Sequence, residues 1–380
     1  MRATILPLVF LGLVSAQSFA QENFVDKHVK VYYEPGRFGG WPANHGIWIW
    51  GNEILVGFGR GYYKDLGPEK HNIDRDKPEE HVLARSLDGG ETWTLEHPND
   101  KGFLLPQGKE GLHGTELPGV PLKPSVYCPG DIDFTHPDFA MALRMTSVHA
   151  GSSNFYYSYD RGKVWEGPFF VPSFGIEGTA ARTDYIVDGK RSCTVFLTAP
   201  KASGEEGRPF CMRTRDGGTA WEFLSWIGEE MEGFAIMPSS VRISDTELIT
   251  AIRCQTETRK RIALYVSNDN GYSWTYLNDP VADTGKGNPA SMIKLADGRI
   301  CITYGVRAVP YRMCAKLSSD NGRTWGPEIT LRNDGSGRDL GYPRTVQRPD
   351  GKVVTVYYFM DAQTGPERYI GATIWDPAKM

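Results

Sequence analysis

The sequence lacks the features that mark several common classes of protein. Its six cysteines form no Cys-x-x-Cys pair and no cluster with histidine, so we expect no metal site. Lysine and arginine form no run and the net charge is -4, which gives no electrostatic reason to bind nucleic acid. No apolar stretch is long enough to span a bilayer. We therefore expect no metal, no cofactor, no nucleic-acid partner and no membrane anchor.

The first twenty residues have the pattern of a secretory signal peptide. Arg2 is followed by the apolar stretch "ATILPLVFLGLVSA", and "SFA" at residues 18–20 is a small-x-small cleavage site. A buried N-terminal helix is the alternative interpretation. No cysteine follows the predicted cut directly, which argues against a lipid anchor. We expect residues 21–380 to form the mature protein, either secreted or periplasmic, where disulfides are permitted but buried free thiols fit equally well.

Turn-forming residues and aromatics are abundant, which favours short strands over helices. There are 43 glycines and 25 prolines, together with 10 Trp, 18 Tyr and 17 Phe. One eight-residue pattern, Ser/Thr-x-Asp-x-Gly-x-x-Trp, occurs five times. Its copies are "SLDGGETW", "SYDRGKVW", "TRDGGTAW", "SNDNGYSW" and "SSDNGRTW", which start at Ser86, Ser158, Thr214, Ser267 and Ser318.

This pattern describes a turn between two strands. The aspartate can accept hydrogen bonds from backbone N–H groups further along, and the glycine supplies a positive φ. The tryptophan would fill an apolar slot beside the turn. The copies recur about every 50 to 70 residues, a period that is typical of propellers and solenoids, with segments such as "CTVFLTA" and "RICITYG" as strands between them.

The strand count predicts an all-β, six-bladed propeller in a single domain over residues 21–380. Five blades carry the turn, and a sixth set of three strands follows the last copy without one. The N-terminal "KHVKVYYE" can supply the fourth strand of that set, so that the two ends of the chain close the ring and remove its open edges. The first interval is longer than the others, which predicts an insertion near Lys101–Tyr127.

The repeated pattern resembles the Asp-box of sialidases and related propellers, and the resemblance extends over nearly the whole mature chain. It implies that the boxes lie on the outer rim, between the third and fourth strands of a blade, and have a structural role. It also implies an exo-acting glycoside hydrolase that removes a terminal acidic sugar from a glycan. The oligomeric state stays open.

The candidate site lies where inner strands begin near the central axis. Four of them share a residue followed by proline, in "GWPANHG", "AIMPSSV", "GKGNPAS" and "LGYPRTV". Side chains beside these prolines are expected to point into the funnel, and the third blade adds a polar set. The candidates for substrate binding are Asn44, Asn288, Arg344, Arg182, Asp184 and Tyr185. Arginines among such groups suit a sugar with a carboxylate or sulfate.

The resemblance assigns roles to individual residues. Tyr342 opens the last inner strand, where sialidases keep the nucleophile, and Arg253 resembles one of the three carboxylate-binding arginines. Arg37 lies near the place of another, although the surrounding Arg-Ile-Pro motif is lost, and Arg307 or Arg312 could be the third. The glutamate partner of the nucleophile is missing, with Pro238 in its place. The acid/base group could be Asp74, Asp76, Glu79 or Glu80, although the paired glutamates also fit a solvated loop.

Two other functions stay open because a tyrosine hydroxyl is a weak nucleophile without a neighbouring base. One is β-elimination or dehydration of a uronate-containing oligosaccharide by His, Tyr and Arg, with His45 or His71 as the proton-transfer group. The other is a non-catalytic binding propeller. We predict that Tyr342 and His45 are the catalytic residues and face one bound sugar, with packing as the alternative role of His45.

Overall fold

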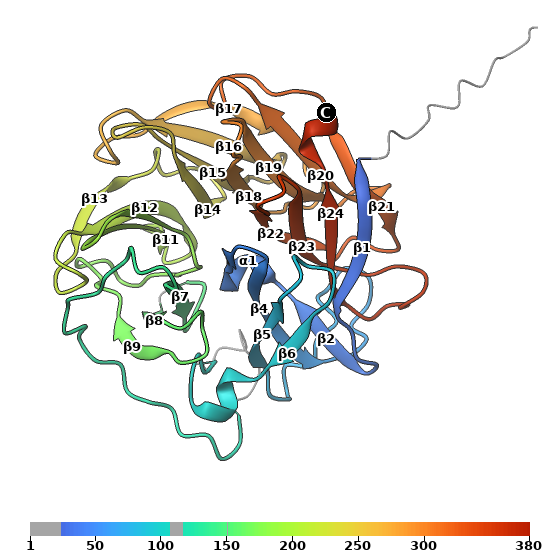
Figure 1. Cartoon of the computed structure of the whole chain (residues 1–380), viewed down its shortest axis with the longest axis horizontal. Coiled ribbons are helices and arrows are strands. Elements are labelled where there is room, and N and C mark those ends of the chain that lie inside the picture. The colour runs from blue at the N-terminus through green and yellow to red at the C-terminus, as the bar shows by residue number, and fades with distance from the viewer. Residues whose placement is uncertain (1–23, 107–116, 150) are drawn as a thin grey trace, which may run out of the picture.

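The structure is a computed structural model that describes residues 24–106, 117–149 and 151–380. Six small antiparallel sheets surround a central axis, as Figure 1 shows, which confirms the predicted all-β, six-bladed propeller. The predicted signal peptide and residues 107–116 of the predicted insertion lie outside the described residues. Within the described part of the chain, no helix is long and apolar enough to cross a membrane.

Four of the sheets follow the chain in simple order from the axis to the rim. Blade 1 contains β2 (Arg37–Gly40), β3 (Ile47–Trp50), β4 (Glu53–Tyr62), β5 (Glu80–Ser86) and β6 (Thr94–Glu96). Blade 3 contains β10 (Tyr185–Gly189), β11 (Ser192–Pro200), β12 (Glu206–Thr214) and β13 (Glu222–Trp226). Blade 4 contains β14 (Phe234–Arg242), β15 (Leu248–Gln255), β16 (Lys260–Ser267) and β17 (Thr275–Val281). Blade 5 contains β18 (Ala290–Lys294), β19 (Ile300–Val306), β20 (Tyr311–Ser318) and β21 (Ile329–Gly335).

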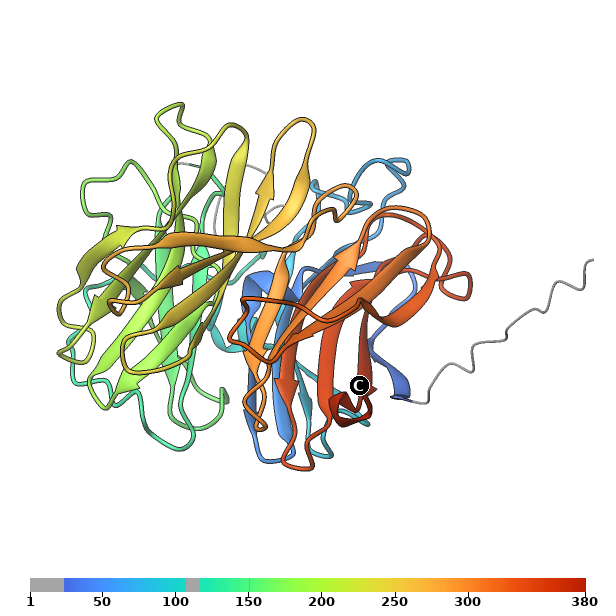
Figure 2. The ribbon, with the colours of Figure 1, turned by 90° about the horizontal axis from the view of Figure 1, so that it is seen from above.

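Blade 6 closes the ring with strands from both ends of the described chain. Its inner strands are β22 (Gly341–Gln347), β23 (Val353–Phe359) and β24 (Tyr369–Trp375), and β1 (Val25–Tyr32) pairs with β24 in antiparallel register. His28 lies opposite Thr373, and His28 Nδ1 is 3.0 Å from the threonine hydroxyl oxygen. The predicted closure by the N-terminal strand is thus confirmed, and Figure 2 shows β1 beside the C-terminal strands.

Blade 2 departs from the regular pattern. It has three described strands, β7 (Ala140–Met145), β8 (Ser153–Ser158) and β9 (Glu166–Phe170), rather than four. Of the segment "DIDFTHPDFAMAL", only the last residues belong to β7. The short helix η1 (Pro98–Lys101) precedes this region, and Val126 bridges to Phe169 on β9.

The inner strand of blade 1 is split in a way that shapes the axis. β2 and β3 both pair with β4, and the helical turn α1 (Pro42–His45) lies between them. Proline in the first turn is compatible with a helix because the missing N–H would have no partner there. Figure 1 shows α1 at the centre of the ring, so this turn brings its side chains to the axis.

Each box is held by the predicted local hydrogen bonds. In the last copy, Asp320 Oδ1 accepts from Thr324 N at 2.8 Å and from Ser318 Oγ at 2.8 Å. Ser318 Oγ in turn accepts from Gly322 N at 2.8 Å. These contacts lower the pKa of Asp320 to about 2, with the bond from the Thr324 hydroxyl as the largest cause. In blades 1, 3, 4 and 5 the boxes lie between the third strand outward from the axis and the fourth, as the resemblance implied, and in blade 2 the box lies between β8 and β9.

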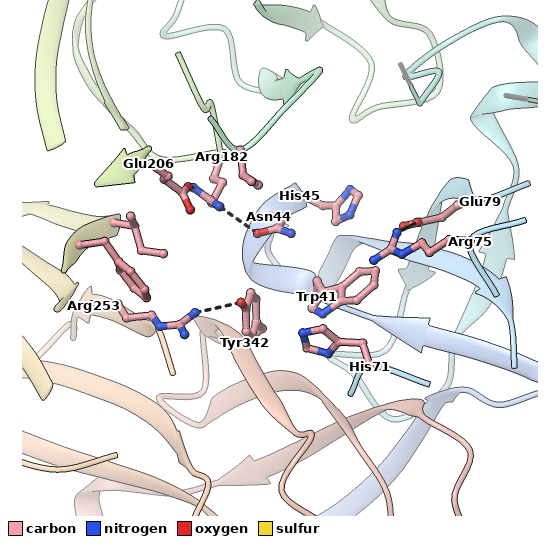
Figure 3. A pocket seen from close by; sticks show the side chains of 13 residues that line it. Trp41, Asn44, His45, His71, Arg75, Glu79, Arg182, Glu206, Arg253 and Tyr342 are labelled. Carbon is pink, nitrogen blue, oxygen red and sulfur yellow. Dashed lines mark hydrogen bonds and ion pairs between the residues drawn. The ribbon is translucent and has the colours of Figure 1, made fainter. Parts of the chain in front are cut away.

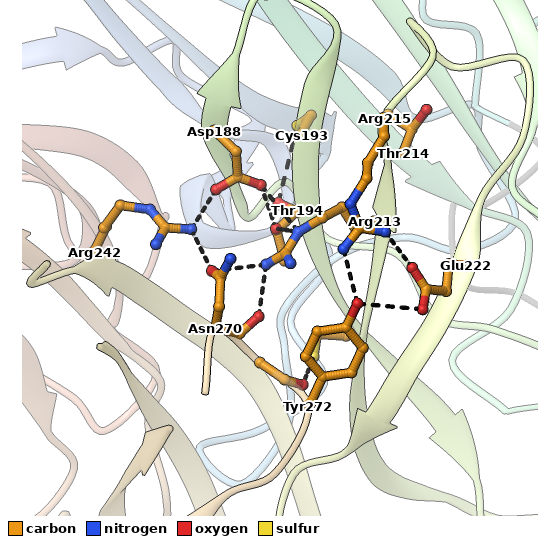
Figure 4. Close-up of polar contacts among 12 residues, drawn as sticks. Asp188, Cys193, Thr194, Arg213, Thr214, Arg215, Glu222, Arg242, Asn270 and Tyr272 are labelled. Atoms are coloured by element: carbon orange, nitrogen blue, oxygen red, sulfur yellow. Dashed lines mark hydrogen bonds and ion pairs between the residues drawn. The ribbon is translucent and has the colours of Figure 1, made fainter. Parts of the chain in front are cut away.

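The boxes also connect neighbouring blades. Figure 4 shows the box residue Asn270 of blade 4 in contact with blade 3, where Arg213 Nη2 donates to its backbone oxygen at 2.7 Å. Arg242 Nη2 donates to the side-chain oxygen of Asn270 at 2.9 Å, and both arginines pair with Asp188. Arg348 of blade 6 likewise donates to the oxygen of Gly89 in the first box. A box therefore fixes its own hairpin against the preceding blade.

The five box tryptophans differ in burial. Trp165 is 2% exposed and packs against Trp48 with ring centroids 5.7 Å apart, whereas the other four are only partly buried. All six cysteines are buried free thiols. Cys193 and Cys211 lie on neighbouring strands, but Cys211 is opposite Phe196, three positions from Cys193. Cys314 is likewise opposite Tyr304, three positions from Cys301. The two cysteines of each pair therefore do not face one another.

We predict that Trp165→Ala lowers the free energy of unfolding by about 3–5 kcal/mol, the usual cost of truncating a buried aromatic residue. Trp274→Ala is the matched control and should cost less, because Trp274 is partly exposed at the same place of its own box. Denaturant unfolding of the two variants measures the difference. Equal losses would contradict the assignment of Trp165 to the core.

Candidate functional site

Three inner strands begin with a backbone conformation that turns one side chain toward the axis. Trp41, Met237 and Tyr342 each precede a proline and have positive φ values of 58°, 56° and 49°. In blades 4 and 6 the strand register shifts at these residues, so that they bulge out of the ladder. Non-glycine residues rarely adopt this conformation, and such residues cluster at functional sites.

A cavity of about 280 Å³ lies over these strand ends, near α1 (Figure 3). Blades 1, 2, 3, 4 and 6 contribute to it, with most of the lining from the inner segment of blade 1 and the loop between β4 and β5. The lining residues are Trp41, Asn44, His45, His71, Arg75, Glu79, Val148, Arg182, Glu206, Phe234, Ile236, Arg253 and Tyr342.

Glu79 is a buried carboxyl in this cavity. Glu79 is 2% exposed, and Arg75 Nη1 is 2.9 Å from Glu79 Oε2. Burial disfavours the charged form and raises the pKa of Glu79 to about 7, although the Arg75 guanidinium acts in the opposite direction. Glu79 can therefore hold a proton near neutral pH and release it in a reaction.

Tyr342 and Arg253 form the opposite side of the cavity. Arg253 Nη1 donates to the Tyr342 hydroxyl oxygen at 3.0 Å, and Arg253 is 9% exposed. No carboxylate of the described residues forms an ion pair with Arg253, and its buried Nε has no hydrogen-bond partner among them. The Arg307 guanidinium lies 5.3 Å from the Tyr342 ring centroid on another side. Tyr342 thus lies between two guanidinium groups, of which Arg253 contacts its oxygen.

Asn288 positions Tyr342 without lining the cavity. Its side chain is fully buried, where Oδ1 accepts from Tyr342 N at 3.0 Å and Nδ2 donates to Leu340 O at 2.8 Å. A Cβ atom on Gly341 would lie 2.2 Å from Asn288 Nδ2, so the backbone approaches this amide closely. The predicted role of Asn288 in direct substrate contact is therefore replaced by a role in holding the bulge.

Arg182 and Asn44 lie together on a third side, as predicted. Arg182 Nε donates to Asn44 Oδ1 at 3.2 Å, and Arg182 Nη1 forms an ion pair with Glu206 Oε1 at 2.7 Å. Glu206 begins β12 and was not among the sequence candidates. Its charge compensates that of Arg182 at the cavity wall.

Two histidines line the cavity in different settings. His45 is 3% exposed, and its ring packs edge-on against His81 with centroids 4.7 Å apart. The side chain of His71 is 40% exposed, and its Nδ1 is 2.7 Å from Asp339 Oδ1. Trp41 separates His71 from Arg75, with the His71 ring centroid at 5.4 Å and the Arg75 guanidinium at 5.1 Å from the Trp41 ring.

Arg37 was predicted to belong to the site, but in the structure it does not line the cavity. Arg37 is buried in β2, pairs with Glu80 at 3.2 Å and lies 3.8 Å over the Tyr62 ring, away from the cavity lining. The reason is that α1, rather than β2, projects toward the axis. Arg37, Arg253 and Arg344 therefore do not line one anion site.

Arg344, Asp184 and Tyr185 line a second cavity of about 320 Å³. Arg344 Nη2 donates to Ala43 O and Thr183 O at 2.5 Å, so it supports the segments that carry Asn44 and Arg182. Burial raises the pKa of Asp184 to about 7, against the opposing charge of Arg344. The Tyr185 hydroxyl accepts from Trp48 Nε1 at 3.1 Å. These three predicted binding residues therefore line the second cavity and not the first.

Sequence reasoning only partly identified the acidic residues. Among the four acids considered before the first box, Glu79 enters the cavity, which shows that the solvated-loop interpretation is wrong for this residue. Asp74 pairs with Lys64 and Glu80 with Arg60, both away from the lining, and the side chain of Asp76 is 86% exposed. No sequence motif around Arg75 or Glu206 indicated that these residues line the cavity.

The comparison with known families identifies the class of this propeller. Residues 139–355, more than half of the chain, match the family model described as a BNR repeat-like domain, and the chain belongs to that family. No curated protein matches the sequence.

Solved structures show the same architecture at low sequence identity. A Dyadobacter fermentans protein of unknown function is 19% identical with a TM-score of 0.66, and the match covers 93% of this chain and 98% of that one. The NanB sialidase of Streptococcus pneumoniae is 12% identical with a TM-score of 0.60, covering 94% and 71%. The Hadza microbial sialidase Hz136 is 14% identical with a TM-score of 0.58, covering 89% and 66%. The fold is that of the sialidase superfamily.

We predict that Asn288→Ala costs about 1–3 kcal/mol of stability, because it leaves a buried carbonyl without its donor. It should also shift the NMR signals of the Tyr342 ring, because the bulge loses its support. Asn278→Ala is the matched control, since the Asn278 amide also donates to two backbone oxygens, but at the rim. Unchanged Tyr342 signals in Asn288→Ala would contradict the positioning role.

Proposed function

We propose that this protein is an exo-acting glycoside hydrolase that removes a terminal acidic sugar from a glycan. The observation that carries the proposal is the placement of Glu79 and Tyr342 in one cavity. Glu79 holds a proton near neutral pH, which suits donation to the leaving oxygen and later removal of a proton from water. Tyr342, beside Arg253, is the nucleophile.

The charges of the cavity support an acidic substrate. Arg75 pairs with Glu79 and Arg182 with Glu206, so two of the three arginines in the lining have a carboxylate partner. Arg253 remains as the cation that can bind a carboxylate on the substrate. We infer that the cavity takes an acidic rather than a neutral sugar.

The size of the cavity supports action on a chain end. Its volume of about 280 Å³ is at the lower end of small-molecule sites, which begin at about 300 Å³. It is lined from several blades around the axis, so it admits one sugar residue in depth rather than the middle of a polysaccharide (Figure 3).

β-Elimination on a uronate is the second candidate, and the histidines of the lining favour it, because elimination needs a base beside the carboxylate. An assay on a panel of acidic oligosaccharides separates the two reactions. Hydrolysis releases reducing sugar without ultraviolet absorbance, whereas elimination produces an absorbing unsaturated uronate. Binding of the panel without either product would favour the non-catalytic propeller.

We also propose that the protein is exported, because residues 1–20 have the pattern of a signal peptide. Expression of the full sequence with its leader should give a protein whose first residue is Gln21. N-terminal sequencing of the secreted or periplasmic fraction measures this. A protein that retains residues 1–20 in the cytoplasm would refute export.

We predict that Glu79→Gln lowers turnover of acidic aryl glycosides by about 10²-fold or more, because the proton donor is lost. In the wild type, kcat/KM should fall as the pH rises through about 7, because Glu79 is then deprotonated. Asp76→Asn, in the same loop but exposed, should leave both rate and pH profile unchanged. A wild-type profile that stays flat across pH 7 would speak against Glu79 as the acid.

We predict that Arg253→Gln weakens binding of a carboxylated sugar by about 10- to 100-fold, the loss expected for a hydrogen bond to a charged group. Binding of the corresponding neutral sugar alcohol should change much less. Calorimetry with both ligands measures the ratio. Equal losses for the two ligands would show that Arg253 does not contact the carboxylate.

A further inference from the structure

The hydroxyl proton of Tyr342 requires an acceptor that Arg253 cannot provide. Arg253 only donates to the Tyr342 oxygen, since a guanidinium has no acceptor atom. The glutamate that the resemblance implies is absent, and Phe234 and Ile236 line the cavity at that strand. If Tyr342 attacks a sugar, as the proposed function requires, another group of the cavity must take its proton.

His71 has the geometry of such a group. Its ring lines the cavity, and its Nδ1 is 2.7 Å from Asp339 Oδ1, so that a proton on Nδ1 faces this carboxylate. The other nitrogen, Nε2, is then an acceptor. Figure 3 shows His71 beside Tyr342 on the same side of the cavity.

Asp339 is held as a carboxylate for this purpose. The residue is 1% exposed, so burial opposes ionisation, but His71, Arg307 and Arg368 outweigh burial and lower its pKa. Arg368 Nε donates to Asp339 Oδ2 at 3.1 Å, and the Tyr358 hydroxyl donates to Oδ1 at 2.5 Å. The carboxylate that faces His71 is therefore fixed in position.

The same network borders Tyr342. Arg307 Nη2 lies 3.7 Å from Asp339 Oδ1, and the Arg307 guanidinium lies 5.3 Å from the centroid of the Tyr342 ring. Tyr358, which donates to Asp339, lies 5.8 Å from the Tyr342 ring between centroids. Asp339 and Tyr342 thus share two buried neighbours, Arg307 and Tyr358, and His71 reaches this network through Asp339.

We propose that His71, oriented by Asp339, accepts the proton of Tyr342 directly or through one water and takes the role of the missing glutamate. As the Tyr342 oxygen bonds to the anomeric carbon, the bond to the leaving oxygen breaks, and Glu79 gives its proton to that oxygen. Water then attacks the anomeric carbon and gives a proton to Glu79. The bond to Tyr342 breaks, and His71 returns the proton to the Tyr342 oxygen. One water is consumed per glycosidic bond.

A glycosyl fluoride of a carboxylated sugar separates the roles of His71 and Glu79. Fluoride leaves without a proton, so Glu79→Gln should release the first equivalent at nearly the wild-type rate. His71→Gln should release it about 10²-fold more slowly, with KM little changed, because activation of Tyr342 is lost. Mass spectrometry should locate the adduct on Tyr342. Release by His71→Gln at the wild-type rate would overturn the proposal.

The orientation of His71 has a readout that needs no turnover. In ¹⁵N NMR spectra of the wild type near neutral pH, His71 should carry its proton on Nδ1, and Asp339→Asn should remove this preference. A proton on Nε2 in the wild type overturns the proposal whatever the activity. If the wild type releases neither fluoride nor sugar while Nδ1 is protonated, the hydrolytic function and the proton transfer fail, and only the orienting contact stands.

Discussion

The pairing of β1 with β24 is the constraint on which the rest of the molecule depends. It joins His28 to Thr373, which are 345 positions apart, and completes the four-stranded sheet of blade 6 from both ends of the described chain. The cavity is lined from blades 1, 2, 3, 4 and 6. Trp41 comes from blade 1 and Tyr342 from blade 6, so the site is a property of the ring and not of any one blade.

The fold could be predicted from the sequence because its signal is local. Every hydrogen bond that closes a box, such as those of Asp320, joins residues no more than four positions apart. The contacts of the boxes with the preceding blade, such as Arg213 with Asn270, span 57 positions and left no pattern in the sequence. The irregular blade 2 likewise depends on contacts between distant segments, such as that of Val126 with Phe169.

Site residues could be predicted where a nearby proline marks the strand end, and they were missed where contacts between distant segments determine the position of a side chain. Tyr342, Asn44 and His45 line the first cavity, and in the sequence each lies within three positions of a proline near an inner strand end. Arg344 was misplaced because alternation along β22 turns it under α1, toward Ala43. Glu79 was underestimated because only the folded loop reveals its burial.

The bulges before Pro42, Pro238 and Pro343 separate what the propeller binds from what holds it together. Trp41, Met237 and Tyr342 lie outside the regular ladder, so a different side chain there need not disturb strand pairing. A cavity built on such positions can acquire a new chemistry through exchange of a few residues. The same ring can therefore carry different side chains at these positions without a change of fold.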